Sequence, residues 1–487
     1  MAKRRFRHLQ MPRQIPLIVI AVLVSTSAPS WAQGPAATSS GLPLSQNPKA
    51  TAPVAGSAKS TATTPIQPAA QKAAPVLPAN PEAASPTMPP STSQSLGWDD
   101  AIRLTRDENA ELRASDEVVK QNEALVKAAW GNYLPSLNAS LSTTKANTNE
   151  TAVADSNSAR LNLTQNLLNG FGDRARIEQS KRNRDAAQAT RDLTRAQVSA
   201  SLKTAYQSLL VAERNVKLSD DIIARRKRNL DLVTLRFEGG RENKGSVLLS
   251  RANYEQAVLE RLQAANTIEA SRAQLAKMIG VERFPYLTLS GVVPVSTPPL
   301  AVDFEAAAAQ SPELRQALAQ QQAADAAVSV AKQGYFPTLD LTASIGRFGP
   351  DFLPQQTNAS ATLGLVIPLF NGGRVYYGVQ AARAVAYNAS YARETALRSK
   401  IVSIRQAYNA YIEAVTAEKV AQSFVTAAET RAEIGRSKYN TGLLSFEEWD
   451  IIESDLVTRQ RRALTSQNDR VSAEAAWEQS QGLGVFN

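Results

Sequence analysis

Four stretches of the chain alternate between apolar and polar residues. A period of two residues is typical of a β-strand whose two faces meet different surroundings. The apolar positions are Leu137, Ala139 and Leu141; Leu161, Leu163 and Leu167; Leu339, Leu341, Ala343 and Ile345; and Ala361, Leu363, Leu365 and Ile367. The positions between them carry mainly Asn, Ser and Thr. Each stretch has about ten residues, the length of a membrane-spanning barrel strand, so the pattern predicts lipid on one face and water on the other.

The ends of these predicted strands differ. Residues 145–158 and 349–358 form connections that are longer than a tight hairpin, and we expect these loops to face away from the cell. Aromatic residues stand at the opposite ends, where a membrane–water interface is expected to collect them. These residues are Tyr133, Phe171, Tyr335, Phe336 and Phe370.

Apolar residues also recur every seven positions, which predicts coiled-coil helices. The first repeating series is Leu202, Leu209, Val216, Ile223, Leu230 and Phe237, with Ala205, Ala212 and Val233 in the companion series. A second segment keeps the repeat less strictly, with Ile404, Tyr411, Val425 and Tyr439, and with Ala407, Ala414, Ala421 and Ala428. No proline lies between residues 136 and 284 or after residue 368, so both helices can run without a break.

Residues 98–282 recur as residues 300–484 at a constant offset of 202, which indicates a tandem duplication. The aligned markers include Tyr133 with Tyr335, Pro135 with Pro337, Gly170 with Gly372, Gly240 with Gly442, and Gly280 with Gly482. Each copy predicts a helix (99–131 or 304–333), two strands, a long helix ending at Phe237 or Tyr439, and a last helix ending at Gly280 or Gly482. The long helix, of about 64 residues, would span about 96 Å. The two shorter helices, stacked end to end, would match it.

The strands constrain the oligomeric state. Lipid requires a closed barrel, because an open sheet edge leaves backbone groups unsatisfied. A single chain offers four strands, whereas bacterial barrels begin at about eight. A dimer would supply eight strands and a trimer twelve, with room for an aqueous pore. The predicted fold class is therefore an α+β membrane protein that oligomerises, with a β-barrel continued by a long helical coiled coil.

The first 32 residues are typical of a secretory signal peptide. A basic start precedes a short apolar run at residues 15–24, and Ser30 and Ala32 favour cleavage near Ala32. Residues 33–95 hold 12 of the 25 prolines and few charges, so we expect a disordered linker. The predicted domain boundaries are 1–32 for the signal, 33–95 for the linker, 96–284 and 300–487 for the repeats, and 285–299 for the connector.

Composition argues against catalysis. The chain has no cysteine, and its one histidine, His8, lies in the predicted signal. Thiolate or histidine metal sites and histidine catalysis are therefore not expected, and no cofactor is predicted. Cleavage would lower the net charge from +10 to +5 by removing Lys3, Arg4, Arg5, Arg7 and Arg13. Export also argues against a nucleic-acid partner for the basic run at residues 225–228, which we interpret as a solvated helix face.

These features together resemble the TolC family of outer-membrane efflux and secretion channels, over residues 96–487. The resemblance depends on the duplicated plan and on short motifs in fixed order. The motifs are Tyr133-Leu134-Pro135-Ser136-Leu137, Tyr335-Phe336-Pro337-Thr338-Leu339, Pro368-Leu369-Phe370-Asn371-Gly372-Gly373-Arg374 and Tyr439-Asn440-Thr441-Gly442. The resemblance implies a homotrimer with a 12-stranded barrel among outer-membrane lipid and a helical barrel in the periplasm. It also implies a passive duct that docks to a periplasmic adaptor and an inner-membrane pump of RND or ABC type.

The same resemblance places the periplasmic entrance at the helix-hairpin tips. The implied gate and selectivity residues are Tyr439, Glu447, Glu448 and Asp450. The implied adaptor-docking residues are Phe237, Gly240, Arg241, Gly442, Leu443 and Leu444. Leu444 and Ile451 stand where the family pattern has a linking arginine and a second acid, so this gate departs from that pattern. Glu447 and Glu448 are also explained as acids that stabilise the first turn of a helix.

Two other classes of function remain open at this point. A non-conducting, envelope-spanning coiled-coil protein would explain the helices but not the alternating strands. A periplasmic adaptor would lack the duplicated strand pairs. The cargo is not indicated, and drug efflux and type I protein secretion are both consistent with the sequence. The absence of tracts rich in Cys, His or Met argues against dedicated handling of soft metals.

Overall fold

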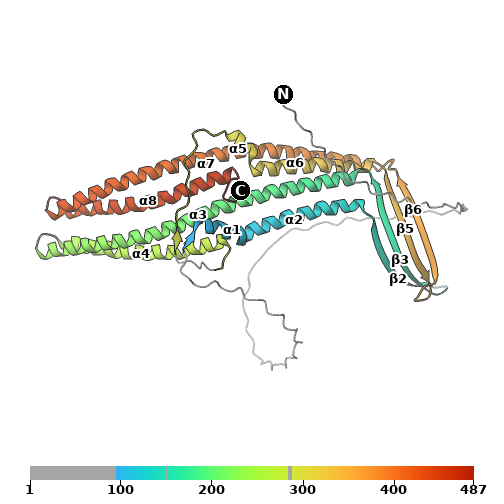
Figure 1. Cartoon of the computed structure of the whole chain (residues 1–487), viewed down its shortest axis with the longest axis horizontal. Coiled ribbons are helices and arrows are strands. Elements are labelled where there is room, and N and C mark those ends of the chain that lie inside the picture. The colour runs from blue at the N-terminus through green and yellow to red at the C-terminus, as the bar shows by residue number, and fades with distance from the viewer. Residues whose placement is uncertain (1–94, 149–150, 283–287, 487) are drawn as a thin grey trace, which may run out of the picture. The chain divides into compact units, whose positions relative to one another are not determined.

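The computed structural model describes residues 95–148, 151–282 and 288–486, and for residues 146–148 and 151–155 it describes the backbone only. The predicted signal and all but the last residue of the predicted linker lie outside these ranges. The first repeat contains β1 (Leu96–Gly97), α1 (Trp98–Glu108), α2 (Ala110–Trp130), a 3-10 turn (Gly131–Tyr133), β2 (Ser136–Thr148), β3 (Thr151–Asn169), α3 (Gly172–Glu238) and α4 (Lys244–Ile279). The second contains β4 (Leu289–Ser290), α5 (Phe304–Gln310), α6 (Pro312–Ala331), a 3-10 turn (Lys332–Tyr335), β5 (Thr338–Gly349), β6 (Gln356–Val366), α7 (Arg374–Asn440) and α8 (Phe446–Ser480) (Figure 1).

The two repeats have the same elements in the same order. Helices α3 and α7 have 67 residues each, and both ends of α7 lie 202 positions after those of α3. Helices α4 and α8 have 36 and 35 residues. The strands join the ends of α2, α3, α6 and α7, whereas the hairpin turns of α3–α4 and α7–α8 lie at the other ends of the long helices (Figure 1). The tandem duplication is confirmed.

The first helix of each repeat is not continuous, contrary to the prediction. Asn109 interrupts the first one with an extended backbone, and its side chain accepts hydrogen bonds from the N–H groups of Glu111 and Leu112. Ser311 does the same in the second repeat by accepting from the N–H of Leu314, ahead of Pro312 at the start of α6. Capping side chains of this kind satisfy N–H groups that a new helix leaves free, so they favour a break.

The four long strands form one antiparallel sheet in the order β2-β3-β5-β6, which joins the two repeats through β3 and β5. The register places apolar residues opposite one another across all four strands. One such row is Leu137, Leu163, Ala343 and Ala361. The polar residues share the other face, as in the row Asn138, Asn162, Ser344 and Ser360. The predicted two-faced sheet is therefore present.

Two details of the sheet differ from the prediction. Residues 145–158 are mostly strand, since Lys145 pairs with Asp155 and Thr148 with Thr151, so the predicted long loop there is wrong. As a result β3 has 19 residues. A register shift between Asn166 and Leu168 also leaves Leu167 without a cross-strand partner, and Leu168 pairs with Leu339 in its place. Such bulges bend a strand locally and increase its twist.

The helices pack side by side in the order α2, α3, α6 and α7, and α4 and α8 continue the rows of α2 and α6. The end of α4 meets the break between α1 and α2, where the Asn109 Nδ2 donates to the Met278 carbonyl at 2.8 Å. Helix α3 therefore has α2 and α4 beside it, one after the other, as the matched lengths predict. No described helix contains an 18-residue stretch apolar enough to cross a bilayer.

The coiled-coil seam differs between the repeats. In α7 the predicted positions Ile404, Tyr411, Val425 and Tyr439 are all buried. In α3 only Leu202 and Leu209 are buried, whereas Val216, Ile223 and Leu230 are half-buried and Phe237 is exposed. The reason is that α3 contacts α1, α2, α4, α6 and α8, whereas α7 contacts mainly α5, α6 and α8 among the described helices. The buried side of α3 therefore shifts to Ser219, Ile222, Asn229 and Val233.

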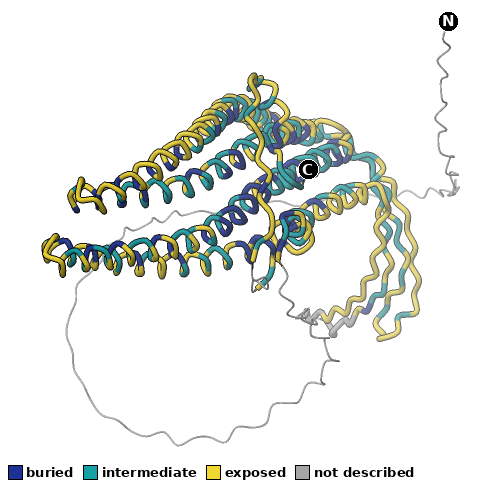
Figure 2. The backbone as a smooth tube through the Cα atoms, turned by 60° about the vertical axis from the view of Figure 1, so that its left-hand side comes forward, coloured by how far each residue is buried: buried dark blue, intermediate teal, exposed yellow. Residues whose placement is uncertain are grey.

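Buried residues lie along the helices, and the sheet is largely exposed within one chain (Figure 2). The main core surrounds the junction of α1, α3 and α4 with the short parallel pair β1–β4. Its fully buried members include Leu96, Leu202, Tyr206, Leu275 and Ile279. The Tyr206 hydroxyl lies within hydrogen-bond distance of the carbonyl oxygens of Leu96 and Ser290 and shares its one proton between them, and burial raises the pKa of Tyr206 to about 12. The α+β fold class is confirmed for the chain.

Candidate functional site at the helix-hairpin tips

The two hairpins turn through glycines with a left-handed backbone. Gly240 has a φ of +69° and Gly442 a φ of +80°, conformations that favour glycine because it lacks a Cβ atom. The next helices then begin with side-chain caps. Asn243 accepts from the N–H of Ser246, and Ser445 exchanges hydrogen bonds with Glu448 in a capping box. These turns fix where each hairpin presents its side chains.

Tyr439 is the central residue of the tip. The residue is 1% exposed, and its ring stacks on Trp449 with ring centroids 4.3 Å apart. The Tyr439 hydroxyl donates to Glu242 Oε2 at 3.0 Å, across from one hairpin to the other. The Arg236 guanidinium lies 4.3 Å from the ring centroid and also donates to the Tyr439 carbonyl. Burial, followed by the hydrogen bond to Glu242, raises the pKa of Tyr439 above its usual value.

A second polar link joins the hairpins further from the turns. Arg226 of α3 donates to Asp450 Oδ1 at 3.1 Å and to Ser454 Oγ at 2.9 Å. Asn253 of α4 donates to the same Asp450 oxygen at 2.9 Å. The Arg226 and Asp450 side chains are only 11% and 21% exposed. Shielding from water strengthens a charge pair, so this contact holds α8 against the first hairpin.

The structure separates the predicted gate residues into two groups. Tyr439 and Asp450 lie inside the contacts between the hairpins. Glu447 and Glu448 are exposed on the first turn of α8. The Ser445 N–H and hydroxyl donate to Glu448 Oε2, and these bonds lower the pKa of that carboxyl group. Glu448 therefore supports the cap of α8 from its first turn, and its charge remains exposed to solvent.

The predicted docking residues lie mostly at the surface of the tips. Phe237, Gly240 and Arg241 are exposed on the first hairpin, and Gly442 and Leu443 on the second. Leu444 differs, because it is half-buried and packs against the cluster of Val233, Tyr439, Phe446 and Trp449. An apolar side chain thus fills the position where the resemblance to the family implied a linking arginine.

The sequence pattern did not indicate Arg226, Arg236 and Glu242 as residues that link the hairpins. The interpretation of residues 225–228 as a solvated face is wrong for Arg226 and also for Arg225, which donates to Gln460 of α8 at 2.7 Å. A signal was present, because Ser219 and Arg226 complete the companion series of Ala205, Ala212 and Val233 at a spacing of seven. The residues of that series lie at the packed face of α3 near the tip. The series through Val216 and Ile223, which the sequence pattern favours, lies beside it.

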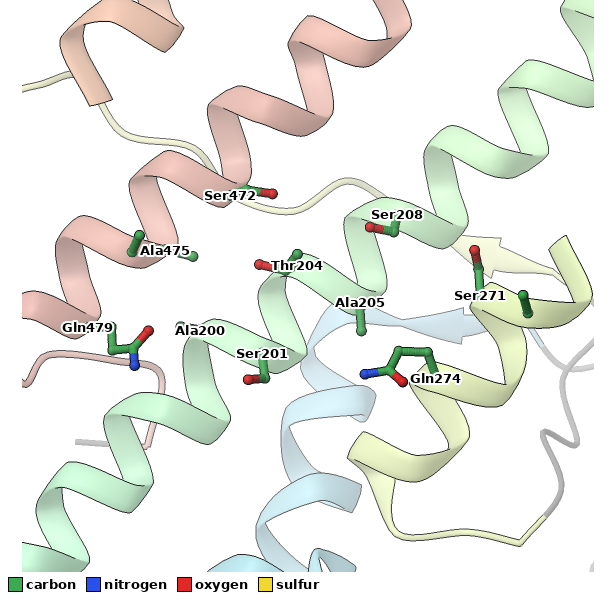
Figure 3. A pocket seen from close by; sticks show the side chains of 12 residues that line it. Ala200, Ser201, Thr204, Ala205, Ser208, Ser271, Gln274, Ser472, Ala475 and Gln479 are labelled. Carbon is green, nitrogen blue, oxygen red and sulfur yellow. The ribbon is translucent and has the colours of Figure 1, made fainter. Parts of the chain in front are cut away.

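A groove along α3, α4 and α8 lies nearer the junction core (Figure 3). Its lining is made of small, hydroxyl and amide side chains, including Ser201, Thr204, Ser208, Ser271, Ser472 and Gln479. None of the lining residues is titratable, so the groove offers no acid–base chemistry. Within the ranges the structure describes, no group of three His, Cys, Asp or Glu could hold a metal ion.

Comparisons with known proteins agree with this geometry. The sequence model of the family described as outer membrane efflux protein matches residues 101–281 and 304–483. The outer membrane protein TolC of Escherichia coli (strain K12) is 25% identical over 383 residues, covering 72% of this chain and 75% of that protein. The nickel and cobalt resistance protein CnrC of Cupriavidus metallidurans is 28% identical over 270 residues, covering 55% and 59%. The solved structure of the outer membrane protein VceC from Vibrio cholerae aligns with a TM-score of 0.68 at 19% identity, covering 79% and 96%.

Proposed function

Because the chain belongs to the outer membrane efflux protein family, we propose that three copies of it form a passive export duct. The protein resides in the outer membrane and is not an enzyme, since its family consists of outer-membrane channels. The barrel crosses the membrane, the long helices extend into the periplasm, and solutes move through the common axis without chemical change.

The observation that carries the proposal is the two-faced sheet with two open edges. Within the described residues, β2 pairs only with β3, and β6 only with β5. In lipid, each unpaired backbone group on such an edge costs several kcal/mol, so the edges need partners from other copies. Twelve strands from three copies close a barrel that holds water on its polar face.

The helices beside the open edges support the same assembly. Helix α2 leads into β2 and α7 follows β6, so in a closed ring α7 of one copy lies against α2 of the next. Both helices expose large uncharged side chains within one chain. Val118 and Leu125 of α2 are 45% and 53% exposed, and Tyr377 and Tyr391 of α7 are 71% and 67% exposed. Covering such surfaces is favourable by about 25 cal/mol per Å².

The hairpin tips form the gate at the periplasmic end. The Tyr439–Glu242 and Arg226–Asp450 contacts hold the second hairpin against the first, and separating the hairpins opens the entrance. The exposed carboxylates of Glu447 and Glu448, repeated in three copies, attract cations to this entrance. The exposed residues Phe237, Arg241 and Leu443 contact a periplasmic adaptor, which connects the duct to an inner-membrane pump.

The gate gives a direct test of conduction. Purified protein is inserted into planar bilayers, and the open-state conductance of the wild type is compared with that of Arg226→Ala. Loss of a charge-assisted hydrogen bond of about 1.5–3 kcal/mol moves the closed–open equilibrium by roughly tenfold or more. We expect Arg226→Ala to spend much more time open. The matched control is Arg228→Ala, in the same basic run but exposed, which should behave as wild type.

Two results would contradict the proposal. Equal open times in Arg226→Ala and Arg228→Ala would remove the gating role of the Arg226–Asp450 contact. A complete absence of conductance in every variant, with trimers intact, would favour the non-conducting, envelope-spanning coiled-coil protein.

A further inference from the structure

The apolar face of the sheet ends at a defined row of residues. From the helices outward, this face carries Leu, Ala, Ile and one Gln, until the row of Leu141, Ala159, Arg347 and Thr357. Arg347 is the first charged residue met on this face. One row nearer the helices lies Ile345, about 6.7 Å from Arg347 along β5. Arg347 therefore marks the outer boundary of the apolar band.

The hydrogen-bond donors at this boundary have no partner among the described residues. Arg347 and Thr357 are directly opposite each other on β5 and β6, and both are exposed. Neither side chain makes a hydrogen bond or an ion pair with any residue that the structure describes. A guanidinium group with five free donors beside a free hydroxyl suits a phosphate group, which accepts paired hydrogen bonds from arginine.

The neighbouring loop adds apolar side chains to the same boundary. Phe352 and Leu353, between β5 and β6, are 86% and 73% exposed. Asn157 holds the start of this loop, because its Nδ2 donates to the Pro350 carbonyl at 2.9 Å and its Oδ1 accepts from Thr143 at 2.9 Å. Asn157 lies on the apolar face, one row beyond Arg347, so the loop is tied to the side of the sheet that meets lipid.

We propose that Arg347 and Thr357 bind the phosphate of a phosphorylated lipid in the outer leaflet of the membrane. The acyl chains of this lipid lie along the rows of Ile345 and Ala343, and Phe352 and Leu353 insert beside its headgroup. This inference rests on the proposed function, because that function places the apolar face in lipid and the hairpin end of the sheet outside the cell.

The chain supplies a matched control in Arg160. Arg160 pairs with Gly346, one position from the Arg347–Ala159 pair, so its side chain lies on the polar face. It is also exposed and makes no hydrogen bond or ion pair with a described residue. The two arginines therefore have the same charge and nearly the same height in the sheet, and differ in the face that they occupy.

The test compares lipid binding of full-length wild type, Arg347→Ala, Arg347→Lys and Arg160→Ala. Each protein is placed in nanodiscs of phosphatidylcholine that contain a small fraction of lipid A with phosphate groups, and bound lipid A per trimer is measured by native mass spectrometry. Loss of the charge-assisted bonds should lower binding about tenfold in Arg347→Ala. Arg347→Lys should keep part of it, and Arg160→Ala all of it.

Equal lipid A binding by wild type and Arg347→Ala would overturn the inference. An equal loss in Arg347→Ala and Arg160→Ala would overturn it too, because the effect would then not depend on the face. Lipid A lacking its phosphates should not be retained, and retention of that lipid would exclude phosphate recognition. Conductance of Arg347→Ala trimers is recorded in parallel. A conducting trimer without selective lipid binding refutes this inference alone, whereas absence of conductance in wild type refutes the proposed function.

Discussion

A buried ion pair joins the two repeats where α3 packs against α8. Lys203 of α3 and Glu474 of α8 are 5% and 2% exposed, and their Nζ and Oε1 atoms lie 3.0 Å apart. The N–H and hydroxyl of Ser296, in the connector between the repeats, donate to the same carboxylate oxygen. One ion pair therefore ties the long helix of the first repeat, the last helix of the second repeat and the connector together.

We expect Lys203→Met to lower the free energy of unfolding by about 3–5 kcal/mol, because it leaves the buried Glu474 carboxylate without its charged partner. The measurement is urea-induced or thermal unfolding of the trimer in detergent. Arg398→Met serves as the control, since Arg398 and its partner Glu394 are 77% and 53% exposed and should contribute less than about 1 kcal/mol. Equal free energies of unfolding for the two variants would show that the buried pair stabilises the fold no more than an exposed pair does.

The sequence pattern identified Tyr439 as a tip residue but did not identify the residues that contact it. The heptad spacing and the motif around Gly442 placed Tyr439 at the tip, and its burial is confirmed. Glu242 and Arg226 could not be assigned, because both reach Tyr439 or Asp450 from positions nearly 200 residues or more away in the chain. A charged residue in a basic run gives no sign of a partner on another helix. Only the packing of the two hairpins creates that contact.

Helix ends explain how the elements fit together. Gly280 ends α4 with a φ of +89°, and a Cβ atom there would lie 2.4 Å from the Glu108 carbonyl oxygen. The corresponding Gly482 follows α8, and a Cβ atom there would lie 2.1 Å from Pro312 Cδ. In both repeats the last helix therefore meets the break in the first helix at a point that has room only for glycine. This contact aligns the shorter helices along the long one.

Gly280→Ala should destabilise the protein more than Gly240→Ala does. Both glycines have a left-handed backbone, which costs an alanine about 1–2 kcal/mol. Gly240 has open space around it, whereas Gly280 adds a clash with Glu108, for which overpacking costs of about 1–3 kcal/mol are typical. Thermal unfolding of both variants measures the difference. The close contact would be unimportant if the two variants unfolded at the same temperature.

The helices and strands were largely predictable because their apolar patterns continue regularly over long stretches. The alternation in β5 and β6 and the heptads of α7 each persist over several repeats, so local errors average out. The breaks at Asn109 and Ser311 were missed because each depends on one capping side chain. The extension of β2 and β3 beyond residue 145 was missed because Thr, Ala and Asn there carry no alternating pattern.

The chain as a whole is incomplete as a membrane structure. Among the residues that the structure describes, the sheet has open edges, α2 and α7 expose uncharged residues, and no element covers the apolar face of the sheet. All of these surfaces belong to residues 96–487. The proposed trimer therefore uses the two repeats and needs no contribution from the residues before them.

We expect a variant that lacks residues 33–95 to form the same trimer as wild type, because the surfaces that join the copies all lie after residue 95. The signal segment is kept so that export is unaffected. Native mass spectrometry and size-exclusion chromatography of protein extracted from membranes measure the assembly. Monomers in the variant, under conditions where wild type is trimeric, would assign a structural role to the removed residues.

The polar links at the tips have a consequence for the history of the fold. Four of the linking residues have an apolar counterpart 202 positions away in the other repeat, whereas Arg236 corresponds to Lys438. Glu242 corresponds to Leu444, Arg226 to Ala428, Asp450 to Leu248 and Tyr439 to Phe237. An ancestor built from six identical single repeats would have had six equivalent hairpins, so no hairpin could differ from its neighbours. In the proposed trimer, a duplication within one gene leaves three-fold symmetry in place of that six-fold symmetry. One set of hairpins could then evolve as a fixed frame and the other as the moving part.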